Sequence, residues 1–446
     1  GVSQSDSLIF QSAFEERLIT EALKETQPDF LSLFSAINTD SIKAWGFEKR
    51  LNNFYVALDS KVLATKSNKQ KAKVIFKEVH DQFFKQYEEF TSFNNIFEMG
   101  LYNCVTGSML YSLILKKYGI PYEIKEKPTH VYIVAYPGSE NILFETTNPK
   151  GFYMLDEKQK KAYVQGLVAL KFTTQEHVNK VGLGNAFNEF YYNSENITQT
   201  QLAALQYYNF ALTEYESGRS HEAITHALKT NMLFPSPKHQ YLLLEMLGVA
   251  LSNSNYETLR DIIYVCEFAN ACRDINGRRK ALGIFETILE QRLLKNDDEI
   301  FTAKAYLICK EKIRDTILVN DISFQYHYAM AYWHNVKGDW NSCLNSAGEA
   351  HKINSRDIRL QEIILRAVIM KIDKTDINTN KAIVAEGYAT EFPFLEKNKT
   401  YKALLVYSYA QQSYIMFSRN SETEGYVYMK KVEAAMKLSE EKLPMV

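Results

Sequence analysis

The sequence contains little glycine and proline. Its 446 residues include only 18 Gly and 9 Pro, too few for a collagen-like chain or for a β-sandwich with many turns. The hydrophobic share of 46% and the charged share of 24% exclude a disordered chain. A chain of this length forms two or three domains. We therefore predict a folded, mostly helical protein with more than one domain.

The sequence also lacks a charge excess and a long apolar run. Lys and Arg number 52 and Asp and Glu 53, so no basic excess exists to neutralise phosphates, and no nucleic-acid partner is expected. The longest apolar run, around Tyr241–Leu251, is interrupted by Glu245. This run is too short to span a bilayer, so no membrane span is expected.

The first residues of the chain bear on its location. The chain begins with Gly1 rather than Met, and a polar stretch follows as far as Ser7. This start indicates that a leader was removed, and a secretory signal is the simplest such leader. An extracytoplasmic location, periplasmic or secreted, is therefore expected, and a cytoplasmic location stays open.

The five cysteines are an odd and sparse set. They include no Cys-x-x-Cys pair, which excludes a disulfide framework and a zinc site of that type. Four of them are expected to be buried helix residues: Cys266, Cys272, Cys309 and Cys343. The fifth, Cys104, lies in a different pattern, which is treated below.

No metal or cofactor site is predicted. His221 and His226 belong to a segment that looks like a zinc-protease helix motif, HEAITH, but they are five residues apart instead of four. That spacing rotates the second histidine by about 140° from the first, so the two do not share a helix face. The sequence has no glycine-rich phosphate loop, so it gives no support for a nucleotide cofactor.

The hydrophobic pattern divides the chain. Residues 8 to about 100 follow the spacing of amphipathic helices. A further helix is predicted from Cys104 to Tyr118, where Gly119-Ile120-Pro121 stops it. Three strands then follow, at Tyr122–Lys125, Val131–Tyr136 and Ile142–Thr147. A small antiparallel sheet is therefore expected after one helix, in an otherwise helical protein.

From about residue 198 the pattern is helical to the end. Short polar breaks recur about 40 residues apart, within the range of helical-hairpin repeats. The breaks are Ser217-Gly218-Arg219, Asn253-Ser254-Asn255, Lys295-Asn296-Asp297, Lys337-Gly338-Asp339, Asp373-Lys374-Thr375 and Arg419-Asn420-Ser421. Two segments, Ala211–Leu228 and Ala329–Ala350, resemble tetratricopeptide repeats in their small residues. The predicted fold is an α+β domain over residues 1–195, joined to an all-α helical-repeat solenoid over residues 196–446.

Three residues form a pattern typical of an activated thiol. Cys104 stands at the first turn of a predicted helix, where unpaired N–H groups stabilise a thiolate and can later hold an oxyanion. His130 opens a predicted strand, and Glu145 lies on the return strand of the same hairpin. A nucleophile, a base and an acid that orients the base are the parts of a catalytic triad.

These residues resemble a known family. The order of features is similar to that of the transglutaminase-like branch of the papain-like cysteine enzymes. These features are a helix that begins with Cys and ends at Gly-Ile-Pro, a strand that opens with His130, a Pro137-Gly138 turn and a strand that carries an acid. The family's acid is usually Asp, eight positions after the Pro, and here that position holds Glu145. The resemblance covers about 50 residues closely. It implies a Cys104–His130–Glu145 triad, and a bacterial subset of this family also appends tetratricopeptide-like helices.

The sequence departs from the family pattern at three points. Glu145 is one methylene longer than Asp, and Asn148 is the substitute if the glutamate points away. The aromatic residue that commonly precedes the family's Cys is matched only approximately, by Tyr102. Asn103 is a weak candidate for the second oxyanion donor.

Two functions fit the sequence. The first is a cysteine acyl-transfer enzyme acting on amide bonds of a peptide or protein substrate, as a peptidase or amidase with water as acceptor or as a transglutaminase with an amine. The second is a non-catalytic scaffold that binds a protein partner on the helical repeats. The two are compatible, because the repeats can present a protein substrate to the thiol.

Overall fold

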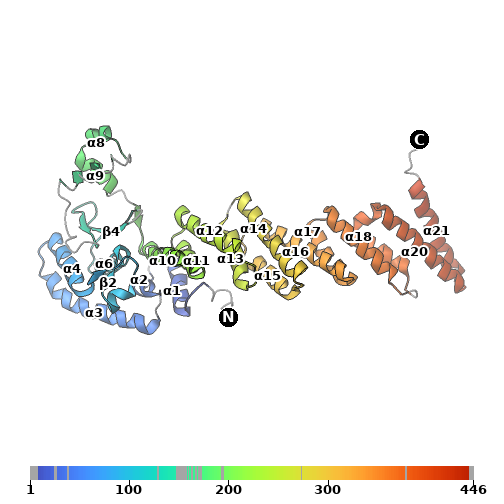
Figure 1. Ribbon diagram of the computed structural model, residues 1–446, viewed down its shortest axis with the longest axis horizontal. Coiled ribbons are helices and arrows are strands. Elements are labelled where there is room, and N and C mark those ends of the chain that lie inside the picture. The colour runs from blue at the N-terminus through green and yellow to red at the C-terminus, as the bar shows by residue number, and fades with distance from the viewer. Residues whose placement is uncertain are drawn as a thin grey trace. The chain divides into compact units, whose positions relative to one another are not determined.

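Two compact units divide the chain, residues 1–250 and residues 251–446. The computed structural model describes residues 9–24, 28–37, 40–127, 130–146, 158, 160–161, 164–165, 168, 173–191, 195–272, 274–376 and 379–440. Helices dominate, and the sheets are small (Figure 1). The prediction of a mostly helical protein with a small antiparallel sheet is confirmed.

The first unit mixes helices and strands. Its helices are α1 (Ala13–Lys24), α2 (Phe30–Ser35), α3 (Ser41–Leu63), α4 (Asn68–Phe83), α5 (Asn94–Glu98), α6 (Cys104–Lys117), α8 (Gln175–Val181), α9 (Leu183–Tyr191), α10 (Gln199–Glu216), α11 (Ser220–Leu233) and α12 (Pro237–Ser252), the last ending just past the division. Its strands are β1 (Gln86–Tyr87), β2 (Leu101–Tyr102), β3 (Tyr122–Lys127), β4 (His130–Ala135), β5 (Ile142–Phe144) and β6 (Glu195–Ile197). The predicted helix and the three predicted strands after it are present, with ends shifted by a few residues.

The larger sheet has the strand order β5-β4-β3-β6, with all neighbours antiparallel. Alternate residues of β4 face opposite sides, as the pleat requires. Val131 and Ile133 belong to the main core together with α6, whereas Tyr132 and Val134 form a smaller buried cluster with Leu143. Figure 1 shows β4, α6 and α3 one below another in this unit. The sheet and α6 thus share one apolar core.

Helix α6 is buried on nearly all sides. Every residue from Val105 to Leu115 except Leu113 is buried, so the helix runs through the core rather than over it. Most of its buried residues are apolar, as expected for a helix inside a core. The helix end is fixed by Gly119 at φ 61°, a left-handed conformation that glycine adopts without strain.

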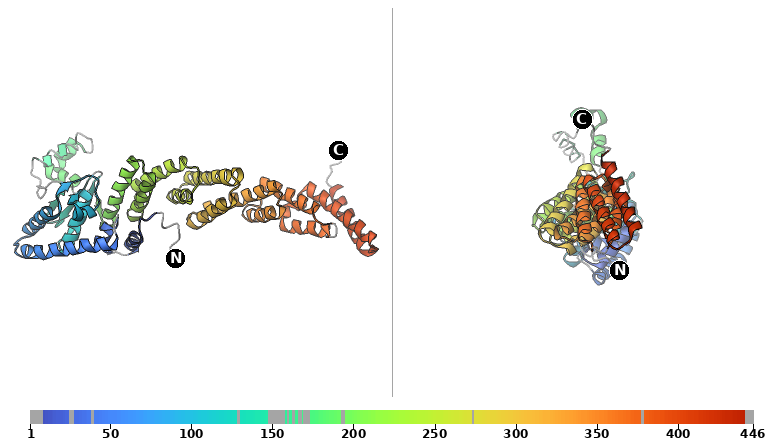
Figure 2. Two further views of the ribbon diagram at one scale, coloured as in Figure 1. Left: turned by 60° about the horizontal axis from the view of Figure 1, so that its bottom comes forward. Right: turned by 90° about the vertical axis from the view of Figure 1, so that its right-hand side faces the viewer.

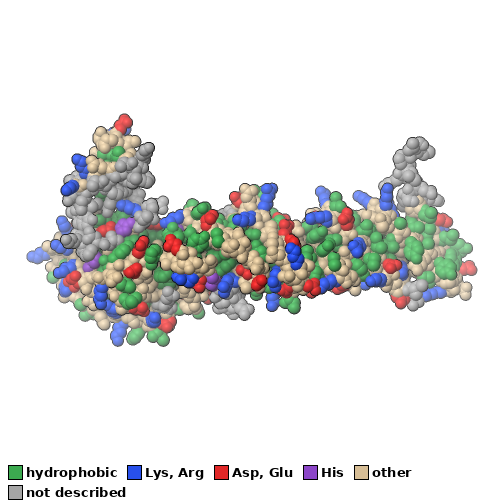
Figure 3. All heavy atoms as spheres, in the orientation of Figure 1, with side chains coloured by type: hydrophobic (Ala, Val, Ile, Leu, Met, Phe, Trp, Pro, Cys, Tyr) green, Lys and Arg blue, Asp and Glu red, His purple; other side chains and the backbone are tan. Residues whose placement is uncertain are grey.

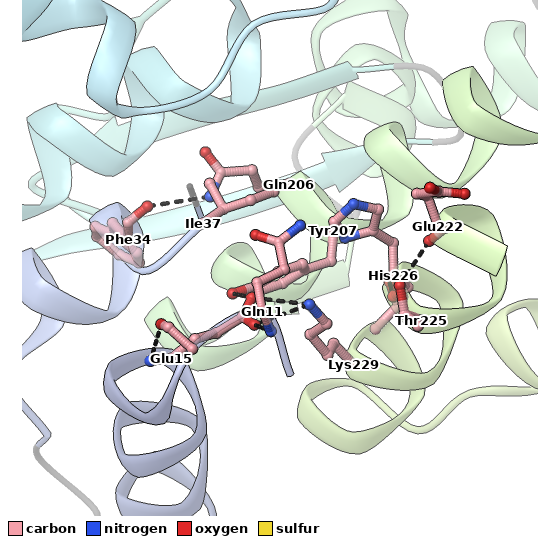
Figure 4. A network of polar contacts seen from close by, with 12 residues as sticks. Gln11, Glu15, Phe34, Ile37, Gln206, Tyr207, Glu222, Thr225, His226 and Lys229 are labelled. Carbon is pink, nitrogen blue, oxygen red and sulfur yellow. Dashed lines mark hydrogen bonds and ion pairs between the residues drawn. The ribbon is translucent and has the colours of Figure 1, made fainter. Parts of the chain in front are cut away.

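The first unit continues well beyond residue 195, where the sequence predicts a domain boundary. Strand β6 pairs with β3, and α10 packs on α6 and α2. A buried ion pair adds to these contacts (Figure 4). Lys229 of α11 donates to both carboxylate oxygens of Glu15 in α1, at 2.8 and 3.0 Å, and the Tyr207 hydroxyl of α10 donates to Glu15 at 2.9 Å. Helices α10 and α11 therefore pack with the sheet-bearing part of the chain.

The second unit is helical throughout its described residues. Its elements are α13 (Leu259–Ala271), α14 (Ile275–Ile288), the π-helical segment η2 (Leu289–Lys295), α15 (Glu299–Lys312), α16 (Thr316–Lys337), α17 (Trp340–Ile353), α18 (Ile358–Asp373), α19 (Lys381–Glu391), the 3₁₀ segment η3 (Pro393–Lys397), α20 (Lys399–Ser418) and α21 (Glu422–Glu440). Consecutive helices such as α16 and α17 pack together, and Figure 2 shows them side by side. The six predicted polar breaks all fall at or between helix ends.

Small residues line the closest helix contacts. Ala223 and Ala227 of α11 are fully buried where this helix packs on α10. Ala347 and Ala350 of α17 are buried in the same way against the neighbouring helices. Gly338, at φ 75°, ends α16 in the left-handed conformation and allows the chain to reverse. These contacts agree with the small-residue pattern of the sequence.

Candidate active site

The first turn of α6 presents Cys104. The chain enters the helix in an extended conformation at Asn103, whose Oδ1 accepts from the Thr106 N–H at 2.9 Å. The Thr106 hydroxyl in turn accepts from the Asn103 N–H at 2.9 Å, which completes a capping box. The Asn-Cys-Val-Thr order therefore starts the helix at Cys104 and leaves the half-buried thiol at the positive end of the helix dipole.

The remaining part of the Asn103 side chain is also engaged. Its Nδ2 donates to the backbone oxygens of Glu89 at 2.9 Å and Thr91 at 3.4 Å, and the residue is only 2% exposed. An amide nitrogen has two hydrogens, and both are accounted for by these carbonyls. The structure therefore places Asn103 as a helix cap and a clamp on the preceding loop.

His130 and Glu145 meet across the sheet. His130 is the first residue of β4, and Glu145 comes directly after β5, which pairs with β4 in antiparallel register. The Nε2 atom of His130 lies 2.8 Å from Oε2 of Glu145. The sequence predicts that Glu145 lies within the strand. In the structure it follows the strand directly, and its side chain, longer than that of aspartate, reaches the imidazole.

Cys104 also acts on His130. Burial by itself would lower the pKa of His130, but the hydrogen bonds with Cys104 and Glu145 and the attraction of their charges raise this pKa to about 9. Because Nε2 faces the glutamate, Nδ1 is the ring nitrogen left for the thiol. The structure thus brings the three predicted catalytic residues together in the order thiol, imidazole, carboxylate.

A close packing contact supports the carboxylate. A Cβ atom built on Gly107 of α6 would lie 3.0 Å from Cβ and 3.1 Å from Cγ2 of Thr146, and 3.4 Å from the Phe84 ring. An alanine at this position would therefore press on Thr146, the residue after Glu145, which would have to move by a few tenths of an ångström. Asn148, the predicted substitute for Glu145, lies outside the described residues.

Two neighbours of the triad were not predicted from the sequence. Lys127 pairs with His130 in the β3–β4 register; burial lowers its pKa to about 8, although the Glu145 charge acts in the opposite sense. Tyr87 of β1 pairs with Tyr102 of β2, just before the nucleophile. The pKa of Tyr87 is raised to about 12 by burial and by the negative charges of neighbours that include Cys104 and Glu145. The two-residue strand of Tyr87 is too short to give a sequence signal.

The structure gives no support for a metal centre in the part of the chain that it describes. No group of three or more His, Cys, Asp or Glu residues is placed there to hold a metal ion. His226 is 3% exposed and packs against the rings of Tyr207 and Phe210, with centroids 5.9 and 5.7 Å away. Burial and the charge of Lys229 lower the pKa of His226 to about 3. This histidine is a packing residue.

Three of the other cysteines, Cys266, Cys309 and Cys343, are buried in helices, as predicted. Cys272 is half-buried and follows the end of α13, so the prediction of a buried helix residue is wrong for this cysteine. None of the helices within the described residues combines the length and the apolar character needed to cross a bilayer.

Comparison with known proteins gives no family for this chain. No family model, no curated protein and no solved structure matches it. The argument for a function therefore rests on the residues and their geometry.

Proposed function

We propose that this protein is a cysteine-dependent acyl-transfer enzyme of the transglutaminase-like type. One observation carries the proposal: the His130 imidazole lies 2.8 Å from the Glu145 carboxylate, and an interaction with Cys104 also raises the pKa of this imidazole. An imidazole in this position can take the thiol proton and hold it, because the carboxylate stabilises the resulting cation. The pKa of about 9 for His130 means that the imidazolium form dominates at neutral pH.

The reaction follows from this arrangement. The thiolate of Cys104 attacks the carbonyl carbon of an amide, a C–S bond forms, and the π electron pair moves to the oxygen. His130 then gives its proton to the amine as the C–N bond breaks, which leaves a thioester on Cys104. Water or a second amine loses a proton to His130 and attacks the thioester, and the thiol is released. Glu145 orients the imidazole throughout.

The start of α6 provides donors for the oxyanion. The first helical hydrogen bond runs from the Gly107 N–H to the Asn103 oxygen at 2.9 Å, so the amides of Cys104 and Val105 precede it. Amides at this place carry the positive end of the helix dipole and can donate to a developing negative charge. This is the second reason for assigning the nucleophile to Cys104.

The experiment is the pH dependence of alkylation by iodoacetamide, read at each cysteine by mass spectrometry. An isolated thiol loses reactivity about 100-fold between pH 8 and pH 6, because its thiolate fraction falls. The proposal predicts less than about a tenfold loss at Cys104, because a neighbouring imidazolium favours the thiolate. His130→Ala should restore the steep profile.

Cys272 is the internal control, because it is half-buried and burial with the Asp274 charge raises its pKa. It should keep a steep profile in both proteins. A steep profile at Cys104 that is unchanged in His130→Ala would contradict the proposed enzyme.

A second candidate function is a protein-binding scaffold. The observation in its favour is a group of exposed aromatic residues on α20 and α21, where Tyr407, Tyr414 and Tyr426 are 64%, 76% and 57% exposed. Figure 3 shows apolar side chains gathered over this end of the second unit. Under this alternative Cys104→Ala would leave function intact, whereas the enzyme loses all acyl transfer. The helical repeats can also present a peptide or protein substrate to the thiol, which joins both functions in one chain.

A further inference from the structure

The oxyanion of the proposed reaction needs a donor opposite the start of α6. Removing a single such donor typically slows an acyl-transfer enzyme 100- to 1,000-fold. Asn103 does not fill the place, because its amide is held by the carbonyls of Glu89 and Thr91. A donor must come from another element that reaches the thiol.

Strand β1 is such an element. It pairs in parallel with β2, and the register sets Tyr87 against Tyr102. The Lys85 N–H donates to the Gly100 oxygen at 2.8 Å, and the Glu88 N–H donates to the Tyr102 oxygen at 2.9 Å. Because β2 leads directly into the helix cap, this pairing places Tyr87 beside Tyr102, two residues before the nucleophile.

The two tyrosines of this pair have different surroundings. Tyr102 is 4% exposed and stacks on Phe84 with ring centroids 4.2 Å apart. Tyr87 stands edge-on to Tyr102, with centroids 5.9 Å apart and the rings perpendicular, and it is 43% exposed. Tyr102 therefore forms a buried support, whereas Tyr87 remains accessible to a ligand.

The electrostatics agree with this placement. Cys104 and Glu145 both act electrostatically on the Tyr87 hydroxyl. After burial, they help to raise its pKa to about 12, and like any tyrosine with a pKa of 10 or above it is protonated at neutral pH. A protonated phenol is a hydrogen-bond donor.

We propose that Tyr87 is a catalytic residue whose hydroxyl donates a hydrogen bond to the oxyanion formed when the Cys104 thiolate adds to a substrate carbonyl. The inference rests on the proposed function and deepens it. The Tyr87 proton stays on the phenol. When the intermediate collapses, the oxyanion's electron pair re-forms the C=O bond and the leaving group departs with its own bonding pair.

The experiment compares two reagents at the same thiol. p-Nitrophenyl acetate acylates a thiolate through a tetrahedral oxyanion, and its leaving group needs no proton from His130. Iodoacetamide alkylates by direct displacement at carbon and forms no oxyanion. In Tyr87→Phe we expect acetylation of Cys104 to slow about 10- to 100-fold, while alkylation changes less than about twofold. Both rates are followed by mass spectrometry of the intact protein and of the Cys104 peptide.

Tyr118→Phe is the matched control. It removes the same hydroxyl at the far end of α6, where the Tyr118 O–H donates to Asp59 at 2.8 Å. Neither rate should change in this variant.

The outcomes separate the two proposals. If Cys104 is acetylated at equal rates in the wild type and in Tyr87→Phe, the role of Tyr87 is wrong and the enzyme stands. If both reagents react faster in Tyr87→Phe, the tyrosine only covers the thiol, and its catalytic role is also wrong. If p-nitrophenyl acetate reacts no faster with the wild type than with Cys104→Ala, the proposed function itself fails.

Discussion

Glu145 stands where the family that the sequence resembles usually has an aspartate. The structure shows how the extra methylene is accommodated: the glutamate lies just after β5 and still places Oε2 at 2.8 Å from Nε2 of His130. The carboxylate is largely buried, with 12% of the side chain exposed. Its charge therefore acts strongly on the imidazole.

The pH dependence of stability should reveal this pair. The folded-state pKa of His130 is about 9, above the usual value of 6.5, so the contribution to stability is complete below about pH 6.5 and is lost as the pH rises through about 9. Glu145→Gln should lower the pKa of His130 and reduce the free energy of unfolding at pH 6 by on the order of 2 kcal/mol.

The measurements are urea unfolding at pH 6, 7.5 and 9.5 and an NMR titration of the His130 ring. Glu145→Asp is the control, because it keeps the negative charge on a shorter side chain. It should change the pKa of His130 less than Glu145→Gln does. A destabilisation by Glu145→Gln that is equal at all three pH values would contradict the ion pair.

Most of the candidate site could be predicted from residue order. Cys104, His130 and Glu145 lie within one helix and one hairpin, so local patterns with short loops bring them together. Tyr87 could not be found in this way. Its strand has two residues and no hydrophobic period, and its partner Tyr102 lies across a helix and a loop.

Helix α6 and the chain after β5 are in unusually close contact at Gly107. An added Cβ would press on Thr146 at 3.0 Å, and Thr146 is fully buried and adjoins Glu145. We expect Gly107→Ala to lower the free energy of unfolding by about 1–3 kcal/mol through overpacking. It should also displace the Glu145 carboxylate. The rate of Cys104 alkylation by iodoacetamide should therefore fall more at pH 6 than at pH 8.

Gly46→Ala is the control, because it makes the same glycine-to-alanine change in a helix. Gly46 lies in the exposed part of α3, and no atom lies within 4 Å of an added Cβ. An alanine there should stabilise the helix by up to about 1 kcal/mol. Urea midpoints for the two variants that move in the same direction would show that the contact with Thr146 is not tight.

The ends of helices can be predicted where a single residue, such as a helix-ending glycine, sets them locally. Gly119 and Gly338 end α6 and α16 in the left-handed conformation, and both stops are readable in the sequence. Strand β6 carries no such signal, because it has only three residues, Glu195–Ile197, whose place is set by pairing with β3 and by the burial of Ile197 in the core. Short pairings over long sequence distances depend on the tertiary fold.

The buried ion pair in the first unit connects segments from the two ends of that unit. Glu15 and Lys229 are both fully buried, and Tyr207 donates to the same carboxylate (Figure 4). Lys229→Met leaves the Glu15 charge without its cation, and we expect it to cost about 3–5 kcal/mol. The double variant Glu15→Gln with Lys229→Met should be more stable than the sum of the two single variants predicts.

A double-mutant cycle in urea measures this coupling. Arg17→Met is the control on the same helix, because the Arg17–Glu21 pair is exposed and should contribute less than about 1 kcal/mol. Single variants at Glu15 and Lys229 whose effects simply add would contradict a buried, coupled pair.

The compact units of the structure and the domains expected from the sequence divide the chain at different places. The sequence predicts a boundary at residues 195 and 196, because the helical repeat pattern begins there, whereas the two compact units divide at Ala250 and Leu251. The reason is that α10 and α11 carry a repeat-like pattern and also pack on α1, α2 and α6. The sequence pattern of α10 and α11 resembles that of the later helices, but their tertiary contacts place both helices in the first unit.

Strand β6 has a practical consequence for dissecting this protein. It covers the outer edge of β3, so a fragment ending before Glu195 would leave a row of unpaired backbone N–H and C=O groups on that strand. Bare edges of this kind recruit strands from other molecules and promote aggregation. An expression fragment that ends at Ser252 keeps the edge strand, the Lys229 partner of Glu15 and the whole of α12, and it suits crystallisation or spectroscopy of the candidate active site.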